Sequence, residues 1–203
     1  MNQRGFTLVE LAFVLVVIGA LTAGVLVGGK QLVRQADKKS FVIKVHTLAQ
    51  AVSAFRDKFH MLPGDFMVDT TKPEIPGLSE GCLSNGDGRG NGNGLIETVE
   101  SPCAKEQLVR AGTLDASAFE FKFPQVQAKL MSVSAAGVPA GRLSVNARNV
   151  LKFENLPCYL AQAADATFDD GALETAVSGK AAAVSGTCPL DDEDAEIAFA
   201  VAL

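Results

Sequence analysis

The stretch RGFTLVELAFVLVVIGALTAGVLVGG, residues 4–29, contains the feature that decides the fold. Residues 11–29 are 19 consecutive residues without a charge, and as a helix with a rise of about 1.5 Å per residue they reach about 28 Å. This length matches the hydrocarbon core of a bilayer, so the stretch predicts a membrane-spanning helix. Glu10 stands near its start, and a charged side chain in lipid costs roughly 2.5 to 3.5 kcal/mol. Glu10 is therefore expected to have a partner.

The same helix is predicted to continue beyond the apolar stretch in amphipathic form. No proline interrupts residues 6–62, and MLPGD at 61–65 supplies the stop with Pro63 and Gly64. We therefore predict one helix over residues 6–60, much longer than a usual globular helix. In its second half, apolar residues at alternating spacings of four and three form a stripe that a globular domain would cover. The stripe consists of Phe41, Val45, Leu48, Val52, Phe55 and Phe59.

The remainder of the chain predicts one α+β domain with an antiparallel sheet. Residues 61–102 are rich in Gly, Pro, Asp and Asn, and they predict a long surface loop. A short helix is expected over 101–112, with Ser101 as its cap, Pro102 in its first turn and Gly112 as its terminator. Alternating apolar residues predict strands, and one further segment predicts a helix. The strands are 118–123, 142–146, 149–153 and 196–203, and the helix lies within 156–168.

The composition and net charge of the chain argue against several classes of function. A chain of 203 residues with 48% hydrophobic content can supply a targeting segment and one globular domain. The net charge of -5 and the pI near 5.1 argue against nucleic acid as a partner, because its binders are strongly basic. His46 and His60 both lie on the predicted long helix, and no nucleophile motif surrounds them. No enzymatic activity is therefore predicted.

The four cysteines predict disulfides. The sequence has no C-x-x-C pair and only two histidines that could complete a zinc site, so disulfide bonds in an exported domain are favoured over a metal. Three pairings are possible. The sequential one is favoured because each bond then closes a loop around a turn-rich stretch, which would stabilise the domain by roughly 3 to 4 kcal/mol per bond. The expected pairs are Cys82 with Cys103 and Cys158 with Cys188.

The segment RGFTLVELAFVLVVIGAL, residues 4–21, resembles the N-terminus of type IV prepilins and type II secretion pseudopilins. The matched pattern is a short basic leader that ends in Gly5, followed by the long apolar helix. Within that helix the matching residues are Phe6, Thr7, Leu8 and Glu10. Three shorter segments are similar to segments that recur in a Gram-negative subgroup of these proteins. They are LPGD at 62–65, EQLVRAGTL at 106–114 and DATFDDG at 165–171.

The resemblance implies a pilin-like α+β fold and a defined maturation. Residues 1–5 would be a leader that a prepilin peptidase removes by cleavage after Gly5, and the new Phe6 amine would be methylated. Residues 6–30 would span the membrane and then assemble, and residues 31–203 would form the amphipathic half of the helix and the globular domain. An amine on Phe6 is mostly cationic at neutral pH, so Glu10 of one subunit can pair with Phe6 of its neighbour.

The resemblance also implies a place in the cell. The precursor would be a single-pass inner-membrane protein with a periplasmic globular domain, and the mature form an extracellular or periplasmic filament. The positive-inside rule opposes this orientation, because Lys30, Arg34, Lys38 and Lys39 follow the apolar stretch, whereas only Arg4 and the initiator amine precede it. We nevertheless expect export, because the leader and the cysteines both require it.

The predicted function is that of a structural subunit of a type IV pilus or a related filament. Its partners would be the inner membrane, the prepilin peptidase and other pilin subunits, in a homo- or hetero-oligomer. The alternatives are a pseudopilin of a type II secretion system and a calcium-binding or adhesive minor pilin at a filament tip. A membrane-anchored enzyme or sensor, with Phe6 uncleaved and its cysteines reduced, is a further alternative.

The loop NGDGRGNGNGLIE at 85–97 raises the possibility of calcium as a cofactor. It alternates oxygen-bearing side chains with glycines, as calcium loops do. It departs from the EF-hand pattern, since Arg89 occupies a ligand position counted from Asp87 and Thr98 stands where the bidentate glutamate belongs. The alternative is a glycine-rich loop tied down by Cys82 and Cys103. The candidate ligands are Asn85, Asp87, Asn91, Asn93 and Glu97.

Overall fold

The computed structural model describes residues 7–67, 74–83, 90–169, 173, 179–189, 192 and 194–203, without the side chains of 24–28. The chain divides into two compact units, residues 1–39 and residues 40–203. One helix, α1 (Leu8–Phe59), contributes to both units and is 52 residues long. The prediction of a single long helix is therefore confirmed over the described residues. The predicted start at Phe6 lies outside them.

In the first unit, α1 exposes apolar side chains on all of its faces. Leu8, Phe13 and Leu21 are 88%, 70% and 65% exposed, and most of the residues between them are also apolar and exposed. A helix that is apolar all round is normally buried, so this segment needs apolar surroundings from outside the chain. Within the part of the chain that the structure describes, no helical window has the length and hydropathy of a membrane span.

In the second unit, the predicted stripe on α1 faces the core. Phe41, Val45, Leu48, Val52 and Phe55 are buried, and Phe59 is half-buried. The helix ends at Phe59, where His60 adopts a left-handed backbone conformation with a φ of 59°. The His60 amide donates to the Arg56 carbonyl at 2.7 Å, which closes the last turn. The helix therefore ends within one residue of the predicted end at residue 60, shortly before Pro63 and Gly64.

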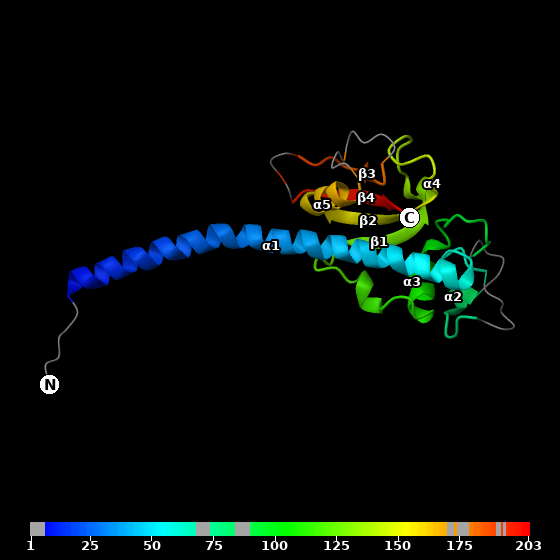
Figure 1. Ribbon diagram of the computed structural model, residues 1–203, viewed down its shortest axis with the longest axis horizontal. Coiled ribbons are helices and arrows are strands. Elements are labelled where there is room, and N and C mark those ends of the chain that lie inside the picture. The colour runs from blue at the N-terminus through cyan, green and yellow to red at the C-terminus, as the bar shows by residue number, and fades with distance from the viewer. Residues whose placement is uncertain are drawn as a thin grey trace. The chain divides into compact units, whose positions relative to one another are not determined.

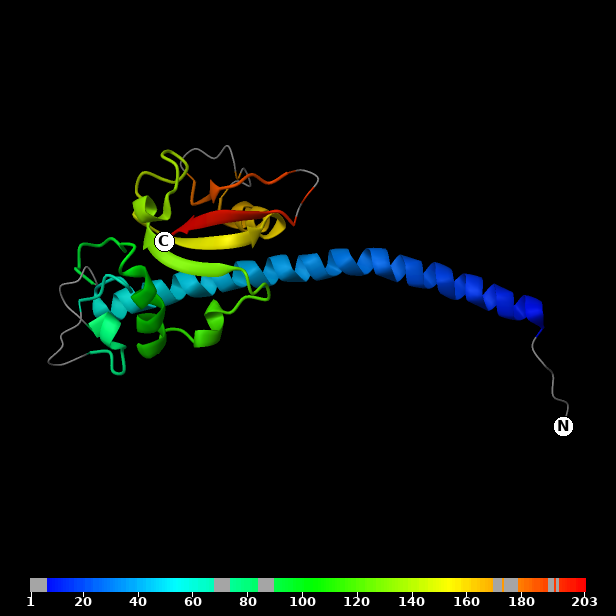
Figure 2. The same cartoon turned by 180° about the vertical axis from the view of Figure 1, so that it is seen from behind.

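A four-stranded antiparallel sheet forms the other layer of this unit. Its strands are β1 (Gln127–Ser132), β2 (Asn149–Pro157), β3 (Ala181–Ser185) and β4 (Glu196–Ala202). Their order is β1-β2-β4-β3, so the C-terminal strand is inserted between β2 and β3, as Figures 1 and 2 show. At the centre of the sheet, Phe153 of β2 lies opposite Phe199 of β4. The α+β class with an antiparallel sheet is therefore confirmed.

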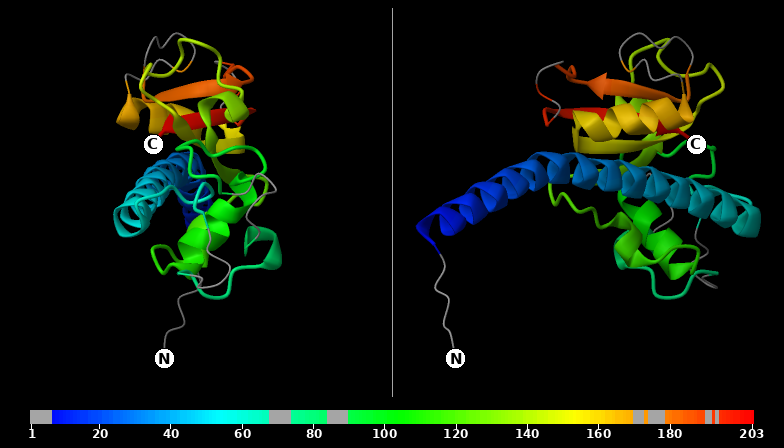
Figure 3. Two further views of the ribbon diagram at one scale, coloured as in Figure 1. Left: turned by 90° about the vertical axis from the view of Figure 1, so that its right-hand side faces the viewer. Right: turned by 60° about the vertical axis from the view of Figure 1, so that its left-hand side comes forward.

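The two faces of the sheet carry different cores. Alternate residues Leu151, Phe153, Phe199 and Val201 belong to the larger core, which residues of α1 and α5 (Cys158–Phe168) complete. Figure 3 shows α5 lying along the sheet. The intervening residues form a smaller core on the opposite face, together with α4 (Val133–Ala136) and the segment after it. This smaller core consists of Met131, Ala136, Leu143, Val150, Ala182 and Ala200.

Phe153 links α1 to the sheet. Its ring is fully buried and meets Phe41 of α1 edge-on at 5.1 Å between centroids. The ring of Phe121 approaches Phe153 at 5.9 Å, also edge-on. Edge-to-face pairs of this kind add about 0.5 to 1.5 kcal/mol each beyond the burial of their area. The helix and the sheet are therefore joined by one aromatic cluster.

Three short helices connect these layers. They are α2 (Glu80–Leu83), α3 (Ser101–Arg110) and the 3-10 helix η1 (Ala116–Phe119). The predicted helix over 101–112 is confirmed as α3, and Gly112 follows its end with a φ of 70°. The predicted cap is wrong: Ser101 is already inside the helix, Glu100 occupies the N-cap position, and no side chain caps the helix there.

Two of the four predicted strands are confirmed, and two are wrong. Segments 149–153 and 196–203 lie in β2 and β4, and the predicted helix within 156–168 is α5. Segment 118–123 is not a strand: its phenylalanines pack against the core, but no strand among the described residues pairs with its backbone. Segment 142–146 contributes only an isolated bridge between Leu143 and Gly179. Alternation predicts which side chains are buried, but it does not supply a hydrogen-bonding neighbour.

Both predicted disulfides are present. Cys82 of α2 bonds Cys103 of α3, and Cys158 at the start of α5 bonds Cys188 after β3. The Cα atoms are 5.5 Å apart in each pair. The sequential pairing predicted from loop closure is therefore confirmed.

Candidate functional site

The N-terminus of α1 carries a reciprocal cap formed by Thr7 and Glu10. The Glu10 carboxylate oxygen Oε2 accepts from the Thr7 amide at 2.9 Å and from its hydroxyl at 3.0 Å. In return, the Thr7 hydroxyl accepts from the Glu10 amide at 3.3 Å. This is a capping box, in which two amides at the helix start are satisfied by side chains. The pattern T-x-x-E before an apolar run could have revealed this role of Thr7 in the sequence.

The capping box leaves part of the Glu10 carboxylate available. Both printed bonds go to Oε2, and Oε1 makes no hydrogen bond with a described residue. Gly5 and Phe6, the other two predicted site residues of this segment, lie outside the described residues. The roles of Gly5, Phe6 and Glu10 in maturation and assembly therefore stay predictions.

In the second unit, the buried carboxylate of Asp65 organises the glycine-rich loop. Asp65 is 2% exposed, and it accepts from the amides of Gly92 at 2.7 Å, Asn93 at 3.2 Å and Gly94 at 2.7 Å. Bonds from amides to an ionised carboxylate are stronger than neutral ones, so they offset the cost of burying the charge. Asp65 thereby fixes the loop against the end of the LPGD segment.

Two glycines make this approach of the loop possible. Gly90 has a φ of 65°, and a Cβ atom there would lie 2.1 Å from the Phe66 carbonyl oxygen, which backbone cannot accommodate. Gly64, with a φ of 95°, donates its amide to the buried Gln107 side chain of α3 at 2.6 Å. The LPGD segment is thus bonded both to the glycine-rich loop and to the EQLVRAGTL segment.

Glu100 supports the same loop from the other side. Its carboxylate is fully buried and accepts from the Glu97 amide at 2.7 Å and the Asn91 amide at 3.3 Å. Burial raises the pKa of the Glu100 carboxyl above its ordinary value, and the carboxylates of Asp65 and Glu97 act in the same direction. The two amide bonds oppose this shift without cancelling it.

The calcium candidates are brought together only in part. Asn91 Oδ1 accepts from the Asn93 amide at 2.9 Å, and Asn93 Oδ1 accepts from the Leu95 amide at 2.7 Å, so both oxygens serve loop turns. Glu97 Oε1 accepts from the Asn93 side chain at 3.3 Å. Asn85 and Asp87 lie outside the described residues. No group of three or more His, Cys, Asp or Glu side chains suited to a metal occurs in the described part of the chain. The calcium site stays a prediction.

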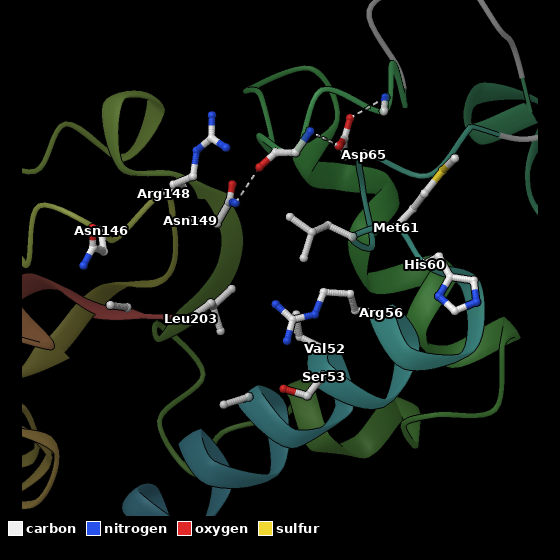
Figure 4. Close-up of a pocket in the computed structure, with 15 residues that line it drawn as sticks. Val52, Ser53, Arg56, His60, Met61, Asp65, Asn146, Arg148, Asn149 and Leu203 are labelled. Carbon is white, nitrogen blue, oxygen red and sulfur yellow. Dashed lines mark hydrogen bonds between the residues drawn. The ribbon is translucent and has the colours of Figure 1, made fainter.

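A cavity of about 470 Å³ opens beside the Asp65 loop. It lies between the last turns of α1, the segment before β2 and the end of β4, and Val52, Leu62 and Leu203 give it apolar walls. Figure 4 shows Arg56 extending from α1 toward Leu203, and Arg148 beside Asn149. No local pattern predicts this cavity, because its two arginines come from distant segments of the chain.

Comparison with protein families identifies the N-terminal segment. Residues 1–26 match the family described as Prokaryotic N-terminal methylation motif. Comparison with curated proteins and with solved structures gives no match. The first 26 residues are therefore an N-terminal segment of the type IV pilin and pseudopilin class.

This motif and the fold are both typical of one class of protein. The long helix packed on a four-stranded antiparallel sheet is a pilin-like arrangement, and the motif implies a pilin-like or pseudopilin subunit. It also implies processing by a prepilin peptidase and assembly with pilin subunits. Proteins of this class are typically structural rather than enzymatic.

Replacing Asp65 tests whether its hydrogen bonds to the loop amides stabilise the fold. Asp65→Asn removes the charge and places an amide donor among backbone donors, so we expect a loss of about 2 to 3 kcal/mol in the free energy of unfolding. Urea denaturation of the purified full chain in detergent measures it. Asp57→Asn, on an exposed position of α1, is the control and should change stability by less than about 0.5 kcal/mol. Equal effects of the two changes would contradict the role of Asp65.

Glu100 should make stability depend on pH. Its raised pKa means that the folded state binds the proton more readily than the unfolded state. The free energy of unfolding should therefore fall as the pH rises through and above the ordinary glutamate pKa. Glu100→Gln should flatten this slope between about pH 4 and pH 7, whereas Glu120→Gln, an exposed control, should leave it unchanged. Urea denaturation across that range provides the measurement, and an unaltered slope in Glu100→Gln would contradict the assignment.

Proposed function

We propose that this chain is a structural subunit of a type IV pilus or a related filament. It is inserted in the inner membrane as a prepilin, cleaved after Gly5, methylated at the Phe6 amine and polymerised through residues 6–30. The observation that carries this proposal is the methylation motif at 1–26, which runs into a helix with exposed apolar side chains on every face. Lipid covers such a helix in the precursor, and neighbouring helices cover it in the filament.

The cap at the start of α1 supports the proposed cleavage point. Thr7 and Glu10 both follow Gly5, so removal of residues 1–5 leaves the capping box intact. The mature chain then begins one residue before Thr7, with a cationic amine at neutral pH. Because Glu10 Oε2 is engaged in the cap, Oε1 is the oxygen that pairs with the Phe6 amine of a neighbouring subunit. This pair offsets the cost of a carboxylate in apolar surroundings.

The disulfides support export of the second unit. Structural disulfides persist in oxidising compartments and are rare in the cytosol. Cys82–Cys103 and Cys158–Cys188 therefore favour a periplasmic globular domain, against the positive-inside count. The same features serve a type II secretion pseudopilin, which is the second candidate within this class.

N-terminal mass spectrometry of the membrane-extracted protein tests the maturation step. We expect the mature chain to begin at a methylated Phe6 and to contain no free thiol, because all four cysteines are paired. Gly5→Leu places a bulky side chain at the cleavage point and should leave a precursor that begins at Met1. Wild-type protein found only as uncleaved precursor would refute the proposed function.

Glu10→Ala tests the assembly step separately. This variant should be cleaved normally, yet its incorporation into filaments should fall at least about tenfold, because the intersubunit ion pair is lost. The matched control is Thr7→Ala, which loses a cap of about 1 kcal/mol but keeps the carboxylate. It should assemble much closer to wild type. The measurement is the amount of protein in filaments sheared from the cells, relative to total mature protein. A wild-type filament yield from Glu10→Ala would contradict the proposed role of Glu10.

A further inference from the structure

The cavity of about 470 Å³ lies in the second unit, whereas the proposed assembly uses residues 6–30 of the first unit. Its walls come from segments that are far apart in the sequence: the last turns of α1, the Asp65 loop, the segment before β2 and the end of β4. Small-molecule sites in proteins typically have volumes of about 300 to 1,000 Å³. The cavity therefore has the size of a ligand site, and its lining decides the class of ligand.

Two arginines with unused donors line this cavity. Arg56 and Arg148 are both exposed, and Figure 4 shows that they come from different walls: Arg56 extends from α1, and Arg148 stands beside Asn149. Neither guanidinium makes a hydrogen bond or an ion pair with a residue that the structure describes. A guanidinium carries five N–H donors in a planar fork that matches a carboxylate. The cavity therefore offers two sets of free donors to a ligand.

The acidic side chain in the lining does not take up these donors. Asp65 is 2% exposed, and its carboxylate already accepts from three loop amides, two of them at 2.7 Å. Asp57 follows Arg56 in the sequence, but successive helical residues point about 100° apart, and Asp57 does not line the cavity. Among the described lining residues, two arginines therefore stand against one aspartate, and this excess of positive charge favours an anionic ligand.

The rest of the lining suits a ligand with an apolar body. Val52, Leu62 and Leu203 form apolar walls, and Leu203 is 38% exposed, so part of this apolar surface is open to a ligand. Ser53 and Asn146 are exposed at the same cavity, and their side chains make no hydrogen bond with a described residue. Both side chains can donate to a bound anion. The cavity thus combines cationic donors, neutral donors and apolar surface.

This combination favours a carboxylate over other anions. A carboxylate carries one negative charge, which matches the excess of one cation in the lining, whereas a phosphate monoester carries about 1.5 to 2 charges at neutral pH. An inorganic anion would leave the apolar walls in contact with water, and covering them is favourable. An organic carboxylate meets both the charge and the apolar surface of the cavity.

We propose that this cavity is a binding site for an organic carboxylate with an apolar body. Arg56 and Arg148 take up its charge, and the apolar walls cover its body. The site goes beyond the filament function and does not depend on it. The carboxylate can belong to a free small acid or to an acidic side chain of a peptide, since both present the same chemical group. A bound ligand would hold the end of α1 to the end of β4, because both segments line the cavity.

Calorimetric titration of the purified full chain in detergent tests the site with three probes. Hexanoate carries both the carboxylate and an apolar body, and it should bind saturably with one molecule per chain. Acetate keeps the charge but lacks four methylene groups, so it should bind at least about tenfold more weakly. Hexanamide keeps the apolar body but has no charge, so it should also bind at least about tenfold more weakly. Equal binding of hexanoate and hexanamide would contradict the role of the arginines.

Substitution of the arginines assigns the binding to this cavity. Arg56→Gln combined with Arg148→Gln should weaken hexanoate binding at least about tenfold, because the charge-assisted hydrogen bonds are lost. The control is Lys105→Gln, which removes an exposed cation of α3 outside the cavity and should leave the affinity within about twofold of wild type. The midpoint of urea denaturation should be the same for all three proteins. If the double variant is less stable, the two single variants replace it, and each should weaken binding at least about threefold.

A blocked tripeptide with glutamate between two leucines distinguishes the two sources of the carboxylate. Tighter binding of the tripeptide than of hexanoate would support the site and identify a protein segment as its ligand. Weaker binding of the tripeptide would support the site and identify a free acid. Absence of saturable binding by both probes, or affinities that the arginine substitutions leave unchanged, overturns the proposal. Such a result would not affect the filament function, which is tested by N-terminal processing and assembly.

Discussion

The burial of one helical stripe is the constraint on which the second unit depends. Phe41, Val45 and Phe55 of α1 are covered because the sheet presents Phe153 and its neighbours to them. α5 completes this larger core. The opposite face of the sheet carries the smaller core, in which Ala182 and Ala200 lie with the larger side chains of Met131, Leu143 and Val150. The long helix is therefore both a structural wall of the globular unit and the carrier of the exposed apolar segment.

Asp65 organises the described part of the loop for which the sequence also predicts a calcium site. A glycine-rich loop has high conformational entropy and needs an organising centre. The expected centre was a cation surrounded by side-chain oxygens, whereas the described part of the loop points backbone amides at a buried carboxylate. Asn91 and Asn93 then use their oxygens to shape the loop itself.

The elements that depend on residues close together in the sequence could be predicted from local patterns. The stripe from Phe41 to Phe59 follows from helical periodicity, and the disulfide pairs follow from loop closure. β1 and β3 were missed because one lacks alternation and the other begins with three alanines, which are poor strand formers. The role of Thr7 was visible as T-x-x-E. The bond from Asp65 to Gly92, and the meeting of Arg56 with Arg148 at one cavity, depend on tertiary folding that no local pattern encodes.

The Cys158–Cys188 bond has a mechanical consequence. It encloses α5 and β3 in a covalent loop with a sequence separation of 30 and a Cα–Cα distance of 5.5 Å. Tension along the backbone would pass through the sulfur atoms and bypass the enclosed segment. Fully extended, those residues would lengthen the chain by roughly 100 Å. The disulfide bond prevents this extension. A stretched subunit would thus keep α5 and β3 protected after its other elements had begun to yield.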